Sequence, residues 1–261
     1  MTVNDVHVTL DTLEPGKLTF CTDIGYAPMQ FVRDGELVGL EIDLAREVAG
    51  RLGLEARFVD QRFDGIVDAL YAGSGDAIVC AVSDSAERRK RLTFVHYFTA
   101  GQTVVVRKGN PEGVHTVEDL AGLRVLVQEG TSNSERLREL DAENQLQGLA
   151  PMFIAGFHGT TGETTERASR QLRAGNGDAD FLDVVNALWR VGRHEELEAT
   201  DVLLDEEPYG FCFRKDDTVL QTAVHGVVVE LYGDSTIDAL LEKWDLAPVG
   251  FADPALVRVN G

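Results

Sequence analysis

The 261-residue sequence lacks most features of membrane, nucleic-acid-binding and disulfide-rich proteins. No apolar run approaches the roughly 18 residues that a membrane-spanning helix needs. Only 24 residues are Lys or Arg against 44 Asp or Glu, and a net charge of −20 repels nucleic acid and anionic membranes. The three cysteines, Cys21, Cys80 and Cys212, stand in apolar stretches, so we interpret them as small buried core residues. The composition is therefore that of an ordinary globular protein, and the excess of acidic residues argues against a nucleic-acid partner without identifying another.

Sequence motifs of common catalytic and cofactor sites are missing as well. The chain has no His-Glu-x-x-His, Cys-x-x-Cys or Gly-x-Ser-x-Gly pattern and no phosphate-binding Gly-Lys-Ser/Thr pair. Gly73-Ser74-Gly75 precedes a predicted strand rather than a helix, so it is not a nucleotide-binding loop. We therefore expect no metal and no cofactor.

What the sequence does contain is a regular alternation of strands and helices. The predicted strands cover 18–22, 56–59, 77–82, 102–108, 123–128, 152–155, 178–183 and 210–215. The predicted helices cover 42–52, 64–71, 133–140, 165–173, 217–232 and 234–244. Strand-helix-strand repeats of this kind form parallel sheets with right-handed crossovers. The Asp34-Gly35 pair predicts a hairpin between its flanking strands.

The stretch from 77 to 91 carries the strongest chemical signal. An apolar run ending at Val82 is typical of a buried strand, Ser83-Asp84-Ser85 favours a helix N-cap, and a basic helical turn is predicted over 86–91. A strand end beside a helix start presents backbone N–H groups, a hydroxyl and the guanidinium of Arg88 at one rim. Such a rim attracts a small carboxylate. Taken alone, however, Arg88 would more often be a solvated surface residue.

Other segments suggest how the chain is divided. Residues 1–17 are polar and irregular, which indicates an N-terminal arm. The strand ends Val106-Arg107-Lys108 and Phe213-Arg214-Lys215 look alike, which predicts twin connections between two lobes. The Gly- and Thr-rich stretch 156–165 predicts a loop.

Several short motifs, in a fixed order from 18 to 247, resemble one protein family. They are Tyr26-Ala27-Pro28, Gly39 to Ala45, Phe63 to Ile66, Gly75 to Ile78, Ser83 to Arg88, Glu118 to Gly122, Val127 to Thr131, Gly177 to Ala179 and Tyr209-Gly210. Together they are similar to the amino-acid-specific extracellular solute-binding proteins of ABC importers. The resemblance implies an α/β fold of two Rossmann-like lobes joined by two crossing strands, the type II periplasmic-binding-protein fold. We predict lobe 1 over 1–101 plus 208–261 and lobe 2 over 102–207.

The resemblance also implies a set of ligand-binding residues. Arg88 would take the α-carboxylate of the ligand in a bidentate pair, supported by Ser83 and the backbone of Ala81. Thr131, from the other lobe, would be a second carboxylate donor. Asp183 would accept the α-ammonium group.

Four further residues bear on the ligand side chain. The resemblance implies that Tyr26 and Phe63 form aromatic walls around it. Asp23 and Glu41 match positions where relatives that bind lysine, ornithine or arginine carry acids. Because a buried cation needs a paired anion, these two acids favour a basic ligand over a polar or neutral one.

Some of these residues also have simpler explanations. Asp183 could be a turn or cap residue, Thr131 a plain helix N-cap and Phe63 a core residue. Glu41 could simply stabilise the start of the helix beginning at Ile42. The stretch 94–98 lacks the family's proline, so the first hinge is expected to differ.

The sequence therefore predicts a non-catalytic protein that captures a free amino acid and delivers it to the permease of an ABC transporter. We expect an extracytoplasmic monomer; no signal peptide is recognisable in this sequence, whose first residues lack the basic and apolar regions of one. One alternative is an enzyme similar to cyclohexadienyl or arogenate dehydratases, which needs a general acid in the cleft. The other is the ligand-sensing domain of a receptor.

Overall fold

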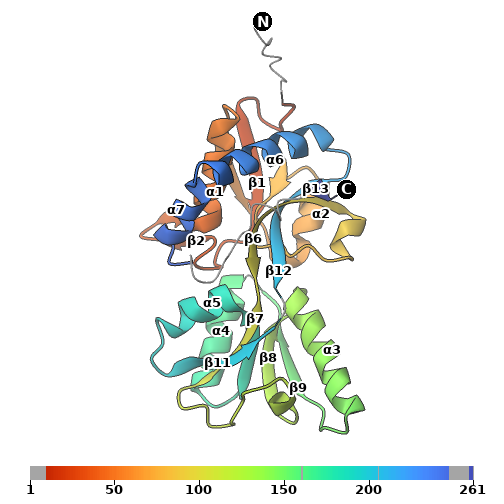
Figure 1. Ribbon diagram of the computed structural model, residues 1–261, viewed down its shortest axis with the longest axis vertical. Coiled ribbons are helices and arrows are strands. Elements are labelled where there is room, and N and C mark those ends of the chain that lie inside the picture. Colours follow the sequence, from red (N-terminus) through yellow and green to blue (C-terminus); the bar gives the residue numbers. More distant parts are fainter. Residues whose placement is uncertain (1–9, 160, 205, 247–258, 261) are drawn as a thin grey trace, which may run out of the picture.

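The computed structural model describes residues 10–159, 161–204 and 206–246, together with the backbone of 259–260. Within these residues the chain forms two α/β lobes stacked along the long axis of the molecule (Figure 1). Each lobe is built on one sheet flanked by helices, which confirms the predicted fold class. Of the predicted N-terminal arm, residues 1–9 lie outside the described residues.

Lobe 1 carries, in the described part of the chain, a six-stranded sheet of order β13-β6-β12-β5-β1-β4. Its strands are β1 (Lys17–Thr22), β4 (Glu55–Asp60), β5 (Ala77–Ile78), β6 (Leu92–Ala100), β12 (Glu207–Arg214) and β13 (Val259–Asn260). Its helices are α1 (Leu40–Arg51), α2 (Ile66–Tyr71), α6 (Thr218–Gly233) and α7 (Thr236–Lys243). β1 runs parallel to β4 and β5, whereas β12 is antiparallel to β5 and β6. The predicted hairpin is present as β2 (Phe31–Arg33) and β3 (Glu36–Val38).

Lobe 2 carries a five-stranded sheet of order β11-β7-β10-β8-β9 among the described residues. Its strands are β7 (Gln102–Arg107), β8 (Arg124–Gln128), β9 (Phe153–Phe157), β10 (Ala179–Asp183) and β11 (Leu197–Leu203). Its helices are α3 (Ser132–Leu146), α4 (Thr161–Arg173) and α5 (Val184–Val191), with a short 3₁₀ turn at Glu118–Leu120. The parallel neighbours β10, β8 and β9 all end at the edge that faces lobe 1.

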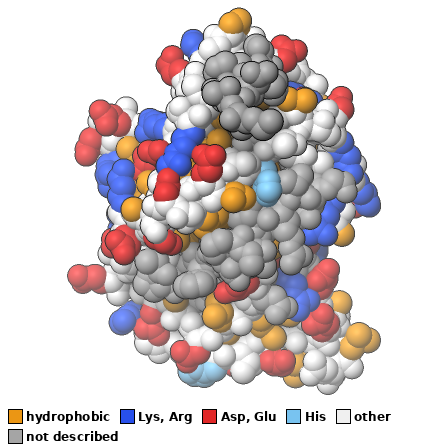
Figure 2. All heavy atoms as spheres, turned by 45° about the horizontal axis from the view of Figure 1, so that its top comes forward, with side chains coloured by type: hydrophobic (Ala, Val, Ile, Leu, Met, Phe, Trp, Pro, Cys, Tyr) orange, Lys and Arg blue, Asp and Glu red, His pale blue; other side chains and the backbone are white. Residues whose placement is uncertain are grey.

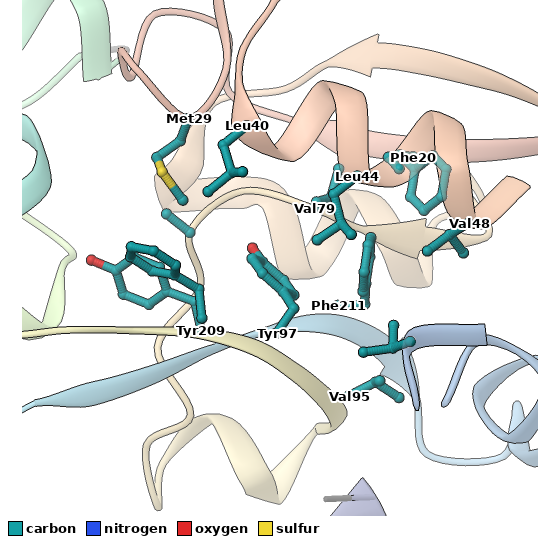
Figure 3. Packing of buried hydrophobic residues seen from close by; sticks show 14 of the residues in the cluster. Phe20, Met29, Leu40, Leu44, Val48, Val79, Val95, Tyr97, Tyr209 and Phe211 are labelled. Carbon is teal, nitrogen blue, oxygen red and sulfur yellow. The ribbon is translucent and has the colours of Figure 1, made fainter. Parts of the chain in front are cut away.

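Both sheets bury apolar side chains on both faces. In lobe 1 one core packs aromatic rings such as Phe20, Tyr97 and Phe211 beneath α1 (Figure 3). The opposite face holds Cys21, Cys80 and Cys212, all buried and free, which confirms their interpretation as core residues. On the outside, acidic side chains are interleaved with basic ones over the face shown in Figure 2 rather than gathered in one patch.

The chain crosses between the two lobes at two adjacent places. β6 passes into β7 through Gly101, and β11 leads to β12 near Leu204. The Leu204 N–H donates to the carbonyl of Gln102 at 2.9 Å, and a Cβ on Gly101 would lie 2.7 Å from the Leu204 oxygen. Glycine is therefore what lets the two crossing segments touch. We keep 101/102 and 207/208 as the proposed lobe boundaries.

The look-alike segments near 106 and 213 do not form these crossings, so that prediction was wrong. They lie at the outer ends of β7 and β12, away from the other lobe. Each arginine there instead donates to two backbone carbonyls of its own lobe: Arg107 to Leu172 and Gly177, and Arg214 to Leu70 and Gly75. The similarity of the two segments therefore reflects a shared structural role, in which an arginine at the end of a strand holds two backbone carbonyls of its own lobe.

Several predicted elements are also corrected by the structure. The strand expected over 77–82 pairs only at Ala77–Ile78, because Ala81 has a left-handed φ of 45° that turns the chain out of the sheet. The basic helical turn expected over 86–91 is present but shorter, as a 3₁₀ turn at Arg88–Lys90, and β6 begins at Leu92. The strands β6 and β11 and the helix α5 were not predicted.

The two lobes are closed on one another through contacts of α5. The Asn186 side chain donates to the carbonyl of Ala27 at 3.0 Å. The rings of Phe31 and Trp189 meet edge to face with centroids 5.1 Å apart, and Val185 packs into the core of lobe 1. Closure therefore buries apolar as well as polar surface, and both stabilise it.

A glycine pair sets how closely the lobes approach, and we predict that Gly25→Ala opens them. Gly25 has a φ of 137°, and a Cβ there would lie 2.8 Å from the backbone N and Cα of Gly162 in the other lobe. Small-angle X-ray scattering should show a larger radius of gyration for this variant. Gly35→Ala is the control, because its φ of 82° is also positive but no atom lies within 4 Å of the added Cβ. Equal scattering from both variants would contradict the prediction.

Candidate functional site

A cavity that is partly open to solvent lies between the two lobes. From lobe 1 it is lined by Tyr26, Gln30, Phe63, Cys80, Ala81, Ser83 and Arg88. From lobe 2 it is lined by Val127, Gln128, Thr131, Ser132, Asn133, Phe157, Thr161, Thr164, Thr165, Ala168, Asp180, Phe181, Leu182, Asp183, Asn186 and Arg190. Every predicted ligand-binding residue except Asp23 and Glu41 is in this lining.

The lobe 1 side of the cavity is built by the turn from Ala81 to Arg88. The Arg88 Nη1 donates to the carbonyl of Ser83 at 2.9 Å, and its guanidinium carbon lies 5.4 Å from the centre of the Phe63 ring. Two independent contacts thus hold the guanidinium at the cavity wall, one electrostatic and one over an aromatic face. Phe63 is partly buried: it packs against a lobe 1 core cluster, as the alternative explanation expected, and it also lines the cavity.

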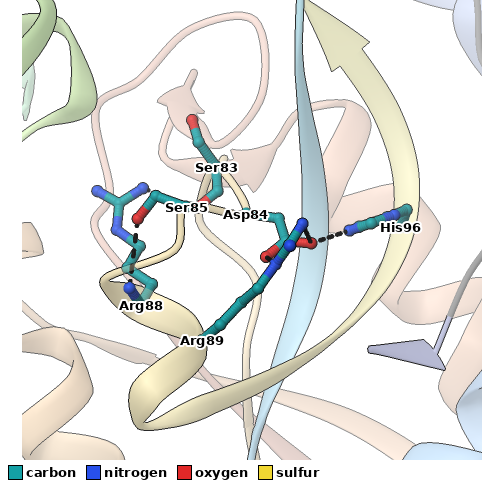
Figure 4. A network of polar contacts seen from close by, with 6 residues as sticks. All are labelled: Ser83, Asp84, Ser85, Arg88, Arg89 and His96. Carbon is teal, nitrogen blue, oxygen red and sulfur yellow. Dashed lines mark hydrogen bonds and ion pairs between the residues drawn. The ribbon is translucent and has the colours of Figure 1, made fainter. Parts of the chain in front are cut away.

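This turn is anchored from behind by Asp84. The Asp84 side chain is fully buried, accepts from the Nε of Arg89 at 2.6 Å and lies 2.7 Å from the Nε2 of His96 on β6. Figure 4 shows that Arg89 joins this network while Arg88 extends to the other side of the turn. Neighbouring arginines therefore have different tasks: Arg89 fixes the turn and Arg88 faces the cavity.

The left-handed backbone at Ala81 is held by Glu41. The Glu41 Oε1 accepts from the Ala81 N–H at 2.7 Å and from the hydroxyl of Tyr97, while Oε2 has no hydrogen-bond partner among the described residues. Burial raises the pKa of Glu41 from 4.5 to about 7 against the effect of these two donors. Glu41 therefore supports the cavity floor from beneath and is not in its lining.

The lobe 2 side of the cavity includes the N-terminus of α3. Thr131 is the N-cap: its hydroxyl accepts from the Ser134 N–H at 3.2 Å and donates to the carbonyl of Gln128 at 2.7 Å. The simpler explanation of Thr131 as a cap thus holds for its side chain. Its position still brings the helix start, with Ser132 and Asn133, to the cavity, where the backbone N–H groups favour an anion.

Asp183 ends β10 and faces Tyr26 across the cleft. The Tyr26 hydroxyl donates to the Asp183 Oδ2 at 2.5 Å. Asp183 occupies the N-cap position of α5, as the alternative explanation expected, but its side chain makes no capping hydrogen bond. Burial raises the pKa of Asp183 above its ordinary value, and the Tyr26 hydrogen bond opposes the shift. The two residues join the lobes within the cavity lining.

Asp23 lies beside the cavity rather than in its lining. Its Oδ2 accepts from the backbone N–H of Thr161 at 3.0 Å, from the Thr161 hydroxyl at 2.9 Å and from the Phe63 N–H at 3.2 Å. Asp23 of lobe 1 thus caps α4 of lobe 2, and this contact between the lobes stabilises the closed arrangement. The expectation that Asp23 and Glu41 present acids to a distal cation loses its structural basis, since neither lines the cavity.

The sequence reasoning missed most of the lobe 2 lining. Thr161 and Thr164 were assigned to a loop, but α4 begins at Thr161 and turns both hydroxyls toward Gln128. Asp180 and Arg190 form an ion pair of 2.5 Å and are each 3% exposed. A charged residue within the apolar strand 179–182 was a signal for a special role, because such residues are rarely buried without a partner.

Comparison with known proteins reveals relatives along nearly the whole chain. Residues 18–247 match the sequence model of the bacterial extracellular solute-binding proteins, family 3. The L-cystine-binding protein TcyJ of Escherichia coli K12 is 30% identical over 234 residues, which cover 88% of this chain and 83% of TcyJ.

Solved structures agree with the sequence comparison. A mutant of ArgBP from T. maritima is 33% identical and superimposes with a TM-score of 0.78, covering 88% of this chain and 95% of that one; another structure of ArgBP is an arginine-bound form. The ancestral amino-acid-binding protein AncCDT-1, described as a precursor of cyclohexadienyl dehydratase, is 31% identical with a TM-score of 0.78 and the same coverage of both chains.

The pKa of Glu41 predicts how stability depends on pH. The folded chain keeps a proton on Glu41 up to about pH 7, whereas the unfolded chain releases it near 4.5, so the folded state binds more protons in this window. The contribution of Glu41 to stability therefore falls as the pH rises from about 4.5 to 7, by about 3 kcal/mol. We expect Glu41→Gln to remove this contribution, so that stability falls less steeply with pH than in the unaltered protein, as measured by urea unfolding between pH 5 and 8.

The control for this measurement is Glu47→Gln, because Glu47 is exposed on the same helix. That variant should keep the pH dependence of the unaltered protein. A Glu41→Gln protein that still loses stability in parallel with the unaltered protein would show that Glu41 is charged throughout.

Proposed function

Because the chain belongs to family 3 of the bacterial extracellular solute-binding proteins, we propose that it captures a free amino acid between its lobes and delivers it to the permease of an ABC transporter. The observation that carries the proposal is that Arg88 of lobe 1 and Asp183 of lobe 2 line one cavity. A guanidinium and a carboxylate on opposite walls match the two charges of a zwitterion.

In this proposal the ligand carboxylate is held from both lobes. Arg88 offers donors from one wall, and Ser83 lies next to it with its hydroxyl 3.4 Å from that of Ser132. The start of α3 contributes backbone N–H groups from the opposite wall. One anion thus bridges two lobes and stabilises the state in which they are closed.

The ligand ammonium group would bind Asp183. In the closed protein that carboxylate accepts from the Tyr26 hydroxyl, with Asn133 and Tyr209 as further neutral partners, and neutral groups leave the negative charge uncompensated. A cationic group therefore gains more from Asp183 than Tyr26 does. A ligand shifts the lobes toward closure only by its differential affinity for the closed state, and bridging contacts of this kind provide it.

The earlier preference for a basic ligand is not retained in the proposal. It depended on Asp23 and Glu41, which cap α4 and support Ala81 instead. The relatives named above include a cystine-binding protein and a protein solved with arginine, so the family name alone favours no side chain. We propose an α-amino acid held by its head group, with Tyr26 and Phe63 beside the side chain.

We propose a binding role rather than a catalytic one. The similarity to AncCDT-1 favours a dehydratase as the second candidate. A general acid has to reach the group it protonates, yet Glu41 lies beneath Ala81 and Asp23 is engaged with α4. Asp183 alone among these acids lines the cavity, and there it is placed to bind an ammonium group.

The proposed setting is outside the cytoplasm, where the protein would work as a monomer beside its permease. Among the described residues, no helix has the length and apolar character that crossing a bilayer requires. Delivery to a transporter, rather than attachment as a receptor's sensing domain, is the simpler role for such a protein. The permease itself is a proposed partner.

The first test is the loss of the guanidinium. Arg88→Ala should weaken the binding of the protein's amino acid by about a hundredfold or more, because it leaves the bound carboxylate buried without its partner. Arg88→Lys should recover only part of the affinity, since an ammonium cannot form the bidentate pair. Calorimetry of the best amino acid from a thermal-shift screen of the twenty amino acids, ornithine and citrulline measures both variants.

Lys90→Ala is the matched control, because Lys90 is exposed two residues away and pairs only with the exposed Glu87 among the described residues. It should bind as the unaltered protein does. Unchanged affinity in Arg88→Ala would refute the assignment of Arg88.

The second test concerns catalysis. The purified protein should leave prephenate and arogenate unconverted over hours, as followed by the ultraviolet absorbance of their aromatic products. Turnover that disappears in Asp183→Asn would instead favour the dehydratase.

A further inference from the structure

A second carboxylate, that of Glu207, stands at the hinge together with Asp183. Glu207 is the first residue of β12 and is opposite Ala100 of β6 in their antiparallel ladder. Asp183 is the last residue of β10 and is opposite Gln102 of β7. Ala100 and Gln102 flank Gly101, through which β6 passes into β7, so both acids lie at the crossing between the lobes.

The charge of Glu207 reaches the Asp183 carboxylate. Glu207 and Tyr209 are two residues apart on β12, so their side chains leave the strand on the same face. The Tyr209 side chain is in turn a neutral partner of Asp183. Burial is the largest cause of the raised pKa of Asp183, and the negative charge of Glu207 adds to it. Glu207 is therefore part of the electrostatic surroundings of Asp183.

Glu207 is held in place by its backbone, but its charge has no partner. β12 pairs with β6, and the N–H of Asp84 donates to the carbonyl of the next residue, Pro208, at 2.9 Å. The Glu207 side chain is partly buried, and its Oε2 is buried with no hydrogen-bond partner among the described residues. No basic side chain in the described part of the chain forms an ion pair with Glu207 or with Asp183.

The stability of the fold does not explain this arrangement. Two like charges near one another destabilise the folded state, and a buried carboxylate oxygen without a donor adds a cost of desolvation. An unmatched polar group of this kind needs an explanation, and perturbed acids gather at functional sites. The missing component is a cation that faces both carboxylates. The cavity is where a cation can enter, because Asp183 lines it.

We propose that Glu207 is a specificity-determining residue, which makes the site select a ligand with an ammonium group over one with a hydroxyl at the same position. This inference rests on the proposed function, in which Asp183 binds the ligand ammonium group. Glu207 is outside the cavity lining and acts through space, as a second negative charge beside Asp183. At the effective dielectric constant of about 20 that suits such sites, one charge still acts on another several Å away.

A 2-hydroxy acid is the ligand against which this selection works. Its carboxylate can bind Arg88 as that of an amino acid does, and its hydroxyl can donate to Asp183 in the place where the Tyr26 hydroxyl donates now. A neutral hydroxyl gains little from a second negative charge, whereas an ammonium group gains from both. The other charged residues of the described lining, Asp180 and Arg190, balance each other and leave this difference intact.

The test compares two ligands with the same side chain. One is the L-amino acid that stabilises the protein most in a thermal-shift screen of the twenty amino acids, ornithine and citrulline; the other is the L-2-hydroxy acid of that side chain. Glu207→Gln keeps the shape of the side chain and removes its charge. Calorimetry should show amino-acid binding weakened by at least about fivefold and hydroxy-acid binding changed by less than about twofold. A hydroxy acid too weak for direct titration is measured by its displacement of the amino acid.

Glu206→Gln is the matched control, because Glu206 is the exposed neighbour and loses the same charge. It should bind both ligands as the unaltered protein does, and Glu207→Asp, which keeps the charge, should keep most of the selectivity. Unchanged amino-acid affinity in Glu207→Gln, or an equal loss for both ligands, would show that Glu207 is structural only and overturn the inference. If no amino acid of the screen binds the unaltered protein, the proposed function itself falls and the inference falls with it.

Discussion

Charge removed from water is the constraint on which the rest of this structure depends. A buried carboxylate or guanidinium costs several kcal/mol unless a partner is supplied. Glu41 and Asp180 find partners in their own lobe. Two other carboxylates take theirs from the opposite lobe: Asp23 from the start of α4, and Asp183 from Tyr26. The closed arrangement is stable because each lobe satisfies polar groups of the other. A few polar groups, above all the Arg88 guanidinium, line the cavity and are available to bind a ligand.

The backbone at Ala81 shows how a local distortion serves the cavity. The strand before it leaves the sheet early, and the left-handed φ of 45° brings the following turn, with Ser83 and Arg88, round to the cleft. A non-glycine residue in this conformation needs support from its surroundings. Glu41 supplies it through the Ala81 N–H and is kept in a desolvated site to do so. The raised pKa of Glu41 is thus a consequence of shaping the turn.

The sequence predicted what is local and missed what depends on distant contacts. The turn from Ser83 to Arg88 was recognisable because its signal is a short contiguous pattern, and the alternation of elements predicted the two α/β lobes. The role of Asp23 was not recognisable, because it depends on Thr161, 138 residues away. The helix α5 was missed because it follows β10 with no intervening turn residues. Arg190 of this helix forms an ion pair with Asp180 of β10. No hydrophobic periodicity in the sequence predicts that these two residues are in contact.

Three aspartates lie at or beside the cavity, but they differ in how readily they can bind an incoming ligand. Their hydrogen-bond partners account for the difference. Asp23 faces the start of α4, a backbone partner that moves only with the whole lobe. Asp180 faces a guanidinium, so its charge is already balanced. Asp183 faces a hydroxyl, which is neutral and can be exchanged without breaking an element of the fold. An incoming ammonium group therefore competes most easily for Asp183, and Asp183 is the group that can sense whether the cleft is filled.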